Sequence, residues 1–480
     1  MPKTQELETL KSLLSSSEVL TKDDDAYHTE SLVWAQQAYQ NPTLVIRPNS
    51  LESLSKAVKF LAESSLDWQV KTGGAGGASA TDVVLSTRAF NETRFVRGEE
   101  VVYLGAGALW GEYYEAMERV APGWTGVVIG CRTPFIGVGG SILAGGFSWL
   151  SGDYGCTSDP DNMLDAQVVK LDGSVVWASE EPDLLWGLRG AQLGLGVVTN
   201  FKLRARPYSQ QIYGGMILIP KGKPNEQRVA AGIATLDTGA PLPKVTMFLY
   251  TLTGMLASVL GGQGDDVLVL HIVDGNGEAH GREMFGWALE IPGAIDHTKV
   301  HNMQGLAKLQ GGAVVNMGKV KAWTQAITMP RITEDIVLEA FRWHERVQAR
   351  GGSSAGETYF LFELFSMRHH TGPSTESAWP RPRDSRHVFL TSACCAPDAS
   401  QDEVDDTIKI GERALKEILG KDYKESYIDA NALEAWNDLE AIYGENWKKV
   451  VKVKRKYDPE ERLKSTPPLD WKEIERKLGI

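Results

Sequence analysis

The sequence predicts an α+β protein with two regions of different character. Up to about residue 206, short strand patterns alternate with glycine-rich segments. Beyond that point the glycine clusters stop and longer alternating strands appear, for instance at 211–219 and 359–366. Amphipathic helical patterns such as 334–350 separate these strands, which favours an antiparallel sheet backed by helices.

The first region begins with helix and loop and continues as a layer of short strands. Residues 50–63 carry apolar side chains at helical spacing after Ser50, a favourable N-cap, and we expect this helix to cover a sheet. Short strands are predicted at 68–71, 82–86 and 100–104, each bounded by a turn or a glycine segment. This order suits a layer that binds a nucleotide.

Three glycine clusters occupy this region, at residues 71–77, 131–146 and 185–199. Glycine lets the backbone approach a ligand closely because it has no Cβ atom. A pyrophosphate needs several backbone N–H donors that converge on it, and glycine-rich turns supply them. The clusters therefore predict a dinucleotide cradle, with tight turns in a β-rich domain as the alternative.

A further segment, 105–111, imitates the glycine fingerprint of Rossmann folds. Its last glycine comes one residue too late for the G-x-G-x-x-G pattern, and no acidic residue is placed to hold a ribose. We therefore assign this segment to packing between a strand and a helix.

Together with two C-terminal motifs, the glycine clusters resemble those of a known enzyme superfamily. The motifs are Ile442-Tyr-Gly-Glu-Asn446 and Lys456-Tyr-Asp-Pro459, and the resemblance begins near Pro42 and covers most of the chain. The chain resembles the FAD-linked oxidoreductases of the vanillyl-alcohol oxidase and berberine-bridge-enzyme superfamily. This implies a bipartite FAD-binding domain of the PCMH type over 1–206, a substrate domain over 207–425, and a C-terminal return to the FAD domain over 426–480.

The resemblance also implies which residues contact the cofactor. They comprise the first two glycine loops, a turn, one adenine contact and one C-terminal asparagine. These residues are Thr72, Gly73, Gly74, Ala75, Gly76, Gly77, Thr133, Ile136, Gly137, Gly139, Gly140, Ser141, Asp161, Asn162, Val197 and Asn446.

Two departures from the family pattern concern covalent attachment of the flavin. Where relatives usually carry a histidine bonded to the flavin 8α carbon, this chain has Ala75, and where many carry a cysteine bonded at C6 it has Thr133. Cys131 lies two residues away and out of register. We therefore predict non-covalent FAD, and with it a weaker oxidant. Ile136, which the resemblance places near the oxygen-reactive face, favours a slow oxidase or a dehydrogenase; a simple core isoleucine is the alternative.

Glu363 is the first candidate for a catalytic base that takes a proton during hydride transfer. It interrupts the apolar run 359–365, and a carboxylate is costly to bury there without a role or a partner. The alternative is a structural ion pair with an arginine such as Arg381 or Arg383.

Two further candidates are Tyr427 and His369. Tyr427 stands where relatives often have a Tyr-x-Asn pattern, with Asp429 at the asparagine position, and a core tyrosine is equally compatible. His369 is one of two adjacent histidines in a polar loop, where a solvated side chain is the more common outcome.

Composition excludes several other classes of protein. The net charge of −12 argues against binding of nucleic acid or an anionic membrane. Residues 245–264 carry no charge, yet their threonine, serine and glycines favour buried strands with a turn over a membrane helix. The N-terminus lacks a basic stretch followed by an apolar core, so we expect a cytoplasmic protein, with a trimmed secretory signal left open.

The cysteines and histidines do not predict a metal site. The four cysteines, Cys131, Cys156, Cys394 and Cys395, lack zinc-like spacing, and we expect them to be reduced and mostly buried. The nine histidines are scattered without ligand spacing, so no metal is predicted.

We therefore expect an FAD-dependent oxidoreductase that transfers a hydride to flavin N5 from a small, largely apolar specialised metabolite, such as an alkaloid, polyketide or terpenoid. Its partners would be that substrate and O2 or another electron acceptor, and the protein would be a monomer or homodimer. The main alternative is a non-redox cyclase or pericyclase that keeps FAD as a structural cofactor. A flavin-binding protein without catalysis and a sugar oxidase are weaker alternatives.

Overall fold

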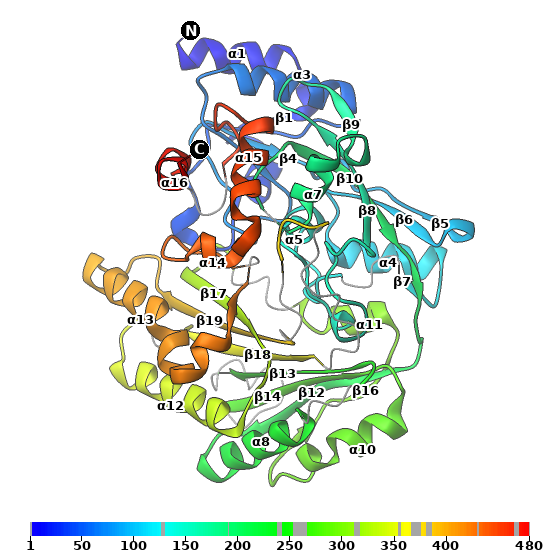
Figure 1. The fold of residues 1–480 in the computed structure, drawn as a ribbon, viewed down its shortest axis with the longest axis vertical. Coiled ribbons are helices and arrows are strands. Elements are labelled where there is room, and N and C mark those ends of the chain that lie inside the picture. Colours follow the sequence, from blue (N-terminus) through cyan, green and yellow to red (C-terminus); the bar gives the residue numbers. More distant parts are fainter. Residues whose placement is uncertain are drawn as a thin grey trace.

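The structure is a computed structural model that describes residues 2–125, 130–190, 192–237, 242–252, 266–311, 317–353, 357–365, 376–380, 386–429, 432–464 and 470–479. Figure 1 shows two halves along the long axis. The N-terminal part of the chain, in blue to teal, builds the upper half, and the middle part, in green to orange, builds the lower half. Helices and sheets occur in both halves, so the predicted α+β class is confirmed.

The first sheet of the upper half holds the strand that leads into the first glycine loop. Its order is β1-β2-β4-β3, in which β2, β4 and β3 run parallel. Helix α3 begins after Ser50, whose hydroxyl accepts from Ser53 N, and it buries one face against this sheet. The elements here are α1 (Lys3–Ser12), β1 (Val19–Leu20), α2 (Asp25–Ser31), β2 (Leu44–Ile46), α3 (Leu51–Glu63), β3 (Trp68–Lys71) and β4 (Val83–Ser86).

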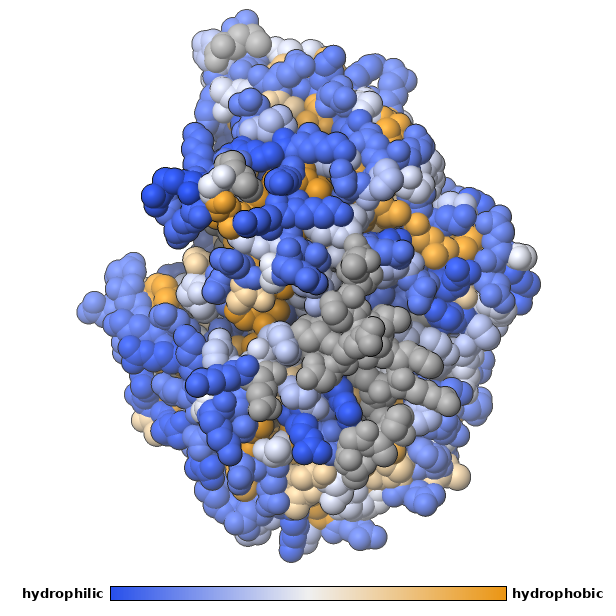
Figure 2. All heavy atoms as spheres, in the orientation of Figure 1, coloured by the Kyte–Doolittle hydropathy of each residue, from blue (hydrophilic) through white to orange (hydrophobic). Residues whose placement is uncertain are grey.

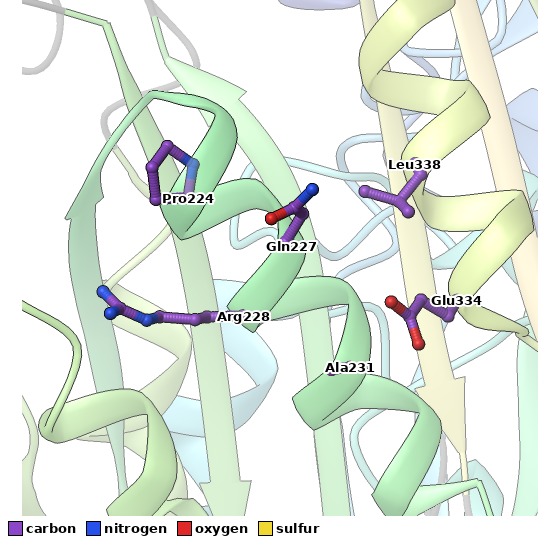
Figure 3. A pocket seen from close by; sticks show the side chains of 6 residues that line it. All are labelled: Pro224, Gln227, Arg228, Ala231, Glu334 and Leu338. Carbon is purple, nitrogen blue, oxygen red and sulfur yellow. The ribbon is translucent and has the colours of Figure 1, made fainter.

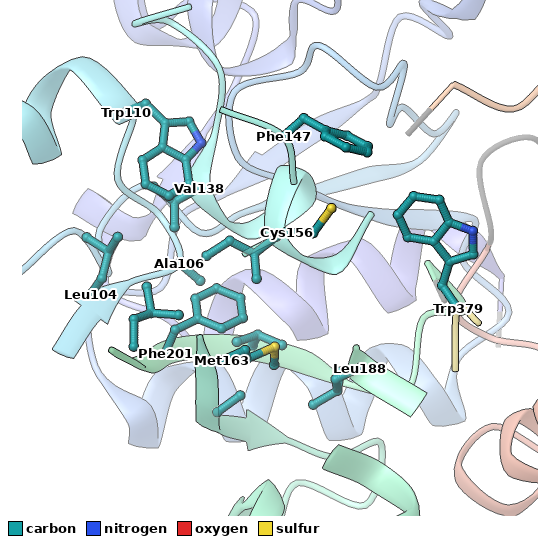
Figure 4. Packing of buried hydrophobic residues seen from close by; sticks show 14 of the residues in the cluster. Leu104, Ala106, Trp110, Val138, Phe147, Cys156, Met163, Leu188, Phe201 and Trp379 are labelled. Atoms are coloured by element: carbon teal, nitrogen blue, oxygen red, sulfur yellow. The ribbon is translucent and has the colours of Figure 1, made fainter. Parts of the chain in front are cut away.

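The second sheet of the upper half is antiparallel, with the order β5-β6-β10-β8-β9. Its core is dense and aromatic, and Figure 4 shows Leu104, Ala106, Trp110, Val138 and Phe201 gathered in one cluster. The second glycine run therefore enters α5 against packed apolar side chains. The elements are β5 (Thr93–Val96), β6 (Val101–Gly105), α4 (Trp110–Val120), β7 (Trp124–Thr125), α5 (Val138–Leu143), α6 (Ser151–Tyr154), β8 (Met163–Val169), β9 (Val175–Trp177), α7 (Pro182–Leu188), β10 (Val197–Arg204) and β11 (Arg206–Pro207).

The lower half is one large antiparallel sheet, with the order β15-β12-β14-β13-β18-β19-β17-β20 and with β16 paired to β12. Helices α8, α10, α12 and α13 lie along its outer side (Figure 1). The elements are β12 (Ile212–Pro220), α8 (Lys223–Leu236), β13 (Val245–Leu252), β14 (Val267–Asp274), α10 (Glu278–Leu289), β15 (Ile295–Asp296), β16 (Lys299–His301), α11 (Met303–Lys308), β17 (Lys321–Met329), α12 (Glu334–Arg350), β18 (Tyr359–Phe365), β19 (His387–Cys395), α13 (Gln401–Leu419) and β20 (Tyr427–Ile428).

The two faces of this sheet belong to different cores. Because side chains alternate along a strand, Phe360, Phe362 and Phe389 pack on one face with the helices. Phe248 and Phe365 point to the other face and join the core of the upper half. The inner face of the large sheet therefore closes against the half that carries the glycine loops.

The C-terminal helices α14 (Leu439–Tyr443), α15 (Trp447–Tyr457) and α16 (Trp471–Leu478) return to the upper half. Lys454 Nζ donates to the carbonyls of Gly194 and Leu463 and to Asp458 Oδ2, at 3.0, 2.7 and 2.5 Å. The Arg462 guanidinium donates to the carbonyls of three residues around the end of α3, Leu61, Ala62 and Leu66. Lys454 and Arg462, which flank the Lys-Tyr-Asp-Pro motif and both bond to its Asp458, thus hold the chain end against the upper half.

Two composition-based expectations can be compared with the described residues. Val245–Leu252 of the uncharged segment is strand β13, while 253–264 lies outside the described residues. Within the described part of the chain, no helix combines the length and hydropathy needed to cross a bilayer. The four cysteines are free thiols, three of them buried and Cys131 half-buried, as expected.

Candidate cofactor and active site

The first two glycine loops touch each other through their backbones. A Cβ atom at Gly73 would lie 2.6 Å from the backbone N of Gly137, and one at Gly137 would lie 2.5 Å from the backbone N of Gly73. Real Cβ atoms do not approach backbone this closely, so neither position accepts a side chain without moving the other loop. These two glycines are needed for the contact between the loops.

Other glycines of the same loops face open space. A Cβ atom at Gly76 or Gly140 would have no atom within 4 Å. Within the described residues, the backbone amides of Ala75 and Gly76 have no hydrogen-bond acceptor. The first loop therefore has two backbone donors without an acceptor next to a position with open space, which fits the pyrophosphate of a dinucleotide.

Two predicted cofactor residues with hydroxyl groups, Thr72 and Ser141, form hydrogen bonds within the protein. Thr72 Oγ1 and Thr87 Oγ1 are 2.7 Å apart. Ser141 Oγ accepts from Trp110 Nε1 at 2.8 Å and donates to the Gly137 carbonyl at 2.9 Å. Both hydroxyls thus help to hold the loops in place, and their direct contact with FAD stays a prediction.

The remaining predicted cofactor residues lie at several places. Asn162 is buried, and its Nδ2 donates to the carbonyls of Tyr154 and Cys156, both at 2.9 Å. Asp161 is exposed and Val197 is fully buried in β10. Asn446 Nδ2 donates to the carbonyls of Ser377 and Ala378 at 3.1 and 3.2 Å, so both asparagines brace loops. Direct contact of these residues with FAD stays a prediction.

The segment 105–111, assigned to packing, is indeed close-packed. A Cβ atom at Gly105 or Gly107 would overlap the backbone of Phe90 or Thr87. Its glycines are needed for the approach of the chain after β4 to β6.

Glu363 lies on the inner face of the large sheet and pairs with Arg132 of the second glycine run. The Arg132 Nη2–Glu363 Oε1 contact joins residues 231 positions apart in the sequence, and the two side chains are 14% and 3% exposed. Glu363 lies directly opposite Phe248 on β13. The Arg132 guanidinium stands 4.4 Å from the Phe248 ring centroid, and Trp149 stacks on the same ring at 4.3 Å. Because a stacked indole and a cation each need a face of the ring, Phe248 is held between them.

Burial raises the pKa of Glu363 to about 7, against the opposing effect of Arg132 and with a smaller increase from Asp429. A carboxyl group that titrates near neutral pH can take up and release protons under working conditions. The predicted alternative partners, Arg381 and Arg383, lie outside the described residues. The residue that the structure places against Glu363 is Arg132, which sequence reasoning missed.

Tyr427 does not converge on Glu363. The cross-strand register runs Glu363–Val388–Thr328–Tyr427, so three inter-strand steps of ~4.8 Å put the two roughly 14 Å apart. Tyr427 is also 39% exposed, at the edge of the sheet. Asp429, two residues further on, is 1% exposed and acts electrostatically on Glu363. The sequence analysis noted Asp429 only as a departure from the family pattern.

His369, the third predicted base, lies outside the described residues. A different histidine lies near the site, because His271 stands directly opposite Phe248 on β14. It is fully buried, and burial lowers its pKa to about 3, so it stays neutral. Its Nδ1 lies 3.3 Å from Gln310 Nε2, and Thr133 Oγ1 donates to Gln310 Oε1 at 3.1 Å. Thr133 is thus tied to the sheet through Gln310 and His271.

An apolar row lies beside Glu363 on the same face of the sheet. Tyr250, Leu361 and Leu390 are opposite one another on β13, β18 and β19, and all three are half-buried. Figure 2 shows hydrophobic atoms near the centre of one face of an otherwise mostly hydrophilic molecule. Because the three side chains of the row are only half-buried, part of the apolar surface next to the carboxylate is accessible.

A separate surface pocket lies between α8 and α12, on the outer side of the large sheet (Figure 3). It is lined by Pro224, Gln227, Arg228, Ala231, Glu334 and Leu338. The helices and the sheet stand between it and the glycine loops, so it forms no part of the candidate site. Among the described residues, no group of three histidine, cysteine or acidic side chains is arranged to hold a metal ion.

Comparisons with known proteins agree with this geometry. Residues 42–179 match the family model for an FAD binding domain. The chain is 29% identical to (R)-6-hydroxynicotine oxidase of Paenarthrobacter nicotinovorans over 206 residues, 42% of this chain and 44% of that protein. It is 30% identical to an FAD-dependent monooxygenase of Cochliobolus heterostrophus over 227 residues, 45% of this chain and 42% of that protein. The chain thus spans less than half the length of these two relatives.

The fold is matched over a longer range. The structure of the wild-type BBE-like 1 protein of Physcomitrella patens superposes with a TM-score of 0.77 at 17% identity, covering 96% of this chain and 98% of that chain. The FAD-binding match includes both loops that meet at Gly73 and Gly137. The comparisons therefore identify an FAD-binding region within residues 42–179 and show that nearly the whole chain shares the fold of the BBE-like 1 protein.

Proposed function

We propose that the protein is an FAD-dependent oxidoreductase that oxidises a small, largely apolar organic molecule. The observation that carries this proposal is the buried Arg132–Glu363 pair, which brings a carboxylate to the second glycine run from the opposite half of the molecule. A carboxylate buried at 2% exposure is costly to maintain, and at this position it has a chemical use.

When bound, FAD supplies the acceptor for a hydride and its two electrons. Glu363 takes the proton from a substrate O–H or N–H group as the hydride leaves the adjacent carbon. Arg132 holds the carboxylate in place and favours its charged form. The Phe248 ring, fixed between Arg132 and Trp149, prevents the guanidinium from turning away.

The substrate class follows from the surface beside the base. Tyr250, Leu361 and Leu390 offer a half-buried, mostly apolar row that suits a hydrocarbon or aromatic skeleton. One relative is named as an oxidase of (R)-6-hydroxynicotine, a hydroxylated compound. An alkaloid, polyketide or terpenoid of similar size is the class we propose here.

We further propose that FAD is held without a covalent bond, because Ala75 has no atom that can bond to the flavin and Thr133 lacks a thiol. The purified holoprotein should release all of its yellow colour into the supernatant on acid precipitation. A yellow pellet would contradict non-covalent attachment and would direct attention to Cys131.

Anaerobic titration with candidate substrates tests the function. Loss of flavin absorbance, together with a product two hydrogens lighter by mass spectrometry, supports the proposed oxidation. Re-admission of oxygen then separates an oxidase, which recovers its colour quickly, from a dehydrogenase. An isomeric product formed without loss of flavin absorbance would instead establish the cyclase alternative.

A further inference from the structure

Lys71 is a buried cation directly beneath the first glycine loop. It is the last residue of β3, and the loop at 73–77 follows it. Its side chain is 4% exposed. A Cβ atom at Gly74 would lie 2.7 Å from Lys71 Cε and 3.4 Å from Nζ, so the ammonium end of the side chain lies against the loop.

The ammonium group of Lys71 has no partner within the described residues. No hydrogen bond or ion pair joins Nζ to any side chain or carbonyl there. Lys71 as a whole keeps 4% of its surface accessible. A ligand on the loop could therefore reach it or act on it at short range.

The neighbouring charges do not neutralise Lys71. Two charged groups act on it, Glu30 favourably and Arg88 unfavourably. Glu30 already binds Arg47 Nη1 at 3.1 Å and Ser86 Oγ at 2.6 Å. Arg88 is held by both carboxylate oxygens of Glu112, at 2.6 and 3.0 Å. Each neighbour thus has its own counter-charge, which leaves the positive charge of Lys71 in excess.

Lys454 is a buried lysine of the same protein that, unlike Lys71, has hydrogen-bond acceptors and a counter-charge. Its side chain is 1% exposed, and its Nζ has three acceptors, one of them the carboxylate of Asp458. A buried charge without such partners is unfavourable in the folded protein. Lys71 lacks the arrangement that makes a buried lysine stabilising.

We infer that Lys71 is the counter-charge for the diphosphate of FAD on the loop at 73–77. The diphosphate carries negative charge, and the open flank at Gly76 and the free amides of Ala75 and Gly76 provide the surface on which it rests. Lys71 then stabilises the bound anion from below the loop. This inference depends on the FAD-binding domain and not on the reaction that the protein catalyses.

The assignment predicts how FAD affinity depends on pH. Burial lowers the pKa of Lys71 to about 8, with Glu30 raising it and Arg88 lowering it. The bound diphosphate favours the charged form, so its pKa is higher in the complex than in the apoprotein. Affinity for FAD should therefore be constant below pH 8 and fall by up to about tenfold per pH unit above it.

Two variants test the inference in apoprotein stripped of flavin. Lys71→Met removes the charge and keeps an unbranched chain, whereas Lys71→Arg keeps the charge. Lys71→Met should weaken FAD binding by about 10- to 100-fold and abolish the pH dependence above pH 8. Its apoprotein should melt about 2 °C or more above the wild type, because an unpaired buried charge has been removed. Lys71→Arg should retain most of the affinity.

ADP, which carries a diphosphate but no flavin ring, serves as a second probe of the same loop. Its affinity should fall in Lys71→Met in parallel with that of FAD. The control variant is Lys170→Met, whose ammonium is paired with Glu181 at 2.8 Å, and it should bind both ligands like the wild type.

Three results would overturn the inference. The first is an unchanged FAD affinity in Lys71→Met. The second is a lower melting temperature of the Lys71→Met apoprotein, with the pH dependence retained, which would make Lys71 a structural residue. The third is weaker binding of FAD without weaker binding of ADP, which would place the effect at the flavin ring.

Discussion

In the upper half of the molecule the site-forming residues lie in two short continuous loops, whereas in the lower half single residues from several strands come together. The loops at 73–77 and 137–141 meet through glycines that a spacing pattern reveals. Glu363, Phe248 and His271 form one row only because β18, β13 and β14 pair in a particular register. The two halves then meet through Arg132, which belongs to a glycine run but pairs with the sheet.

The two halves also differ in how far the comparisons with known proteins cover them. The match to an FAD binding domain ends at residue 179, before the large sheet begins. Over 96% of the chain, the BBE-like 1 protein of Physcomitrella patens shares the fold at 17% identity. Local motifs therefore predict the FAD-binding region, whereas the proposed base lies on the large sheet, outside the matched residues.

The largest expected effect comes from the sheet. Glu363→Gln removes the base but preserves the shape of the side chain and its bond to Arg132, so kcat should fall by about 10²- to 10⁴-fold. FAD content, read from the absorbance ratio of the purified protein, should not change. Tyr427→Phe is the comparison variant, since the register places its backbone roughly 14 Å from that of Glu363, and it should keep kcat within about threefold of the wild type. Equal losses in both variants would contradict the separation of the two sites.

The next effect concerns the contact between the halves. Arg132→Met leaves Glu363 buried without its cation, and breaking a buried pair of this kind costs about 3–5 kcal/mol of unfolding free energy. Because Arg132 lowers the pKa of Glu363, that pKa should rise above about 7, and the acid limb of the kcat/KM profile should move to higher pH. Arg132→Lys should shift the limb less. A profile that does not move in Arg132→Met would show that Glu363 does not control the rate.

Substitution of Lys454 tests whether the two buried lysines affect the stability of the apoprotein in opposite directions. Lys454→Met removes a cation that holds Asp458 and two carbonyls, so urea unfolding should show a loss of about 3–5 kcal/mol. Lys71→Met should change apoprotein stability in the opposite direction. The same sign in both variants would remove the distinction between the two buried lysines.

The smallest effect separates two kinds of glycine within one loop. Gly73→Ala forces a Cβ atom to 2.6 Å from the opposing backbone and should cost about 1–3 kcal/mol of apoprotein stability. Gly76→Ala adds a Cβ atom to open space, so it should leave apoprotein stability nearly unchanged and weaken FAD binding. Thermal melts with and without FAD distinguish the two. A normal FAD affinity in Gly76→Ala would show that this flank does not face the cofactor.

Sequence reasoning predicted those features that depend on local spacing. The mixed fold class, the helix after Ser50, the antiparallel sheet with its helices, and the FAD-binding region all follow from periodicity, caps and motifs. It could not distinguish Gly73 from Gly76, because the former is fixed by a loop 60 residues away. Nor could it pair Glu363 with Arg132 or separate Tyr427 from Glu363, because both depend on strand register. The apolar strand around Glu363 was the one signal of a buried carboxylate; the structure confirms that Glu363 is buried, but the sequence did not indicate its partner Arg132.

The most direct test of the account is the rate of anaerobic flavin reduction by a substrate, followed by flavin absorbance in single turnover across pH 5 to 9. The account predicts that the rate in the wild type rises through one ionisation near pH 7, where Glu363 loses its proton, and that Glu363→Gln binds FAD normally but gives a slow rate independent of pH. A Glu363→Gln variant with the wild-type rate and the same ionisation would contradict the assignment of Glu363 as the base.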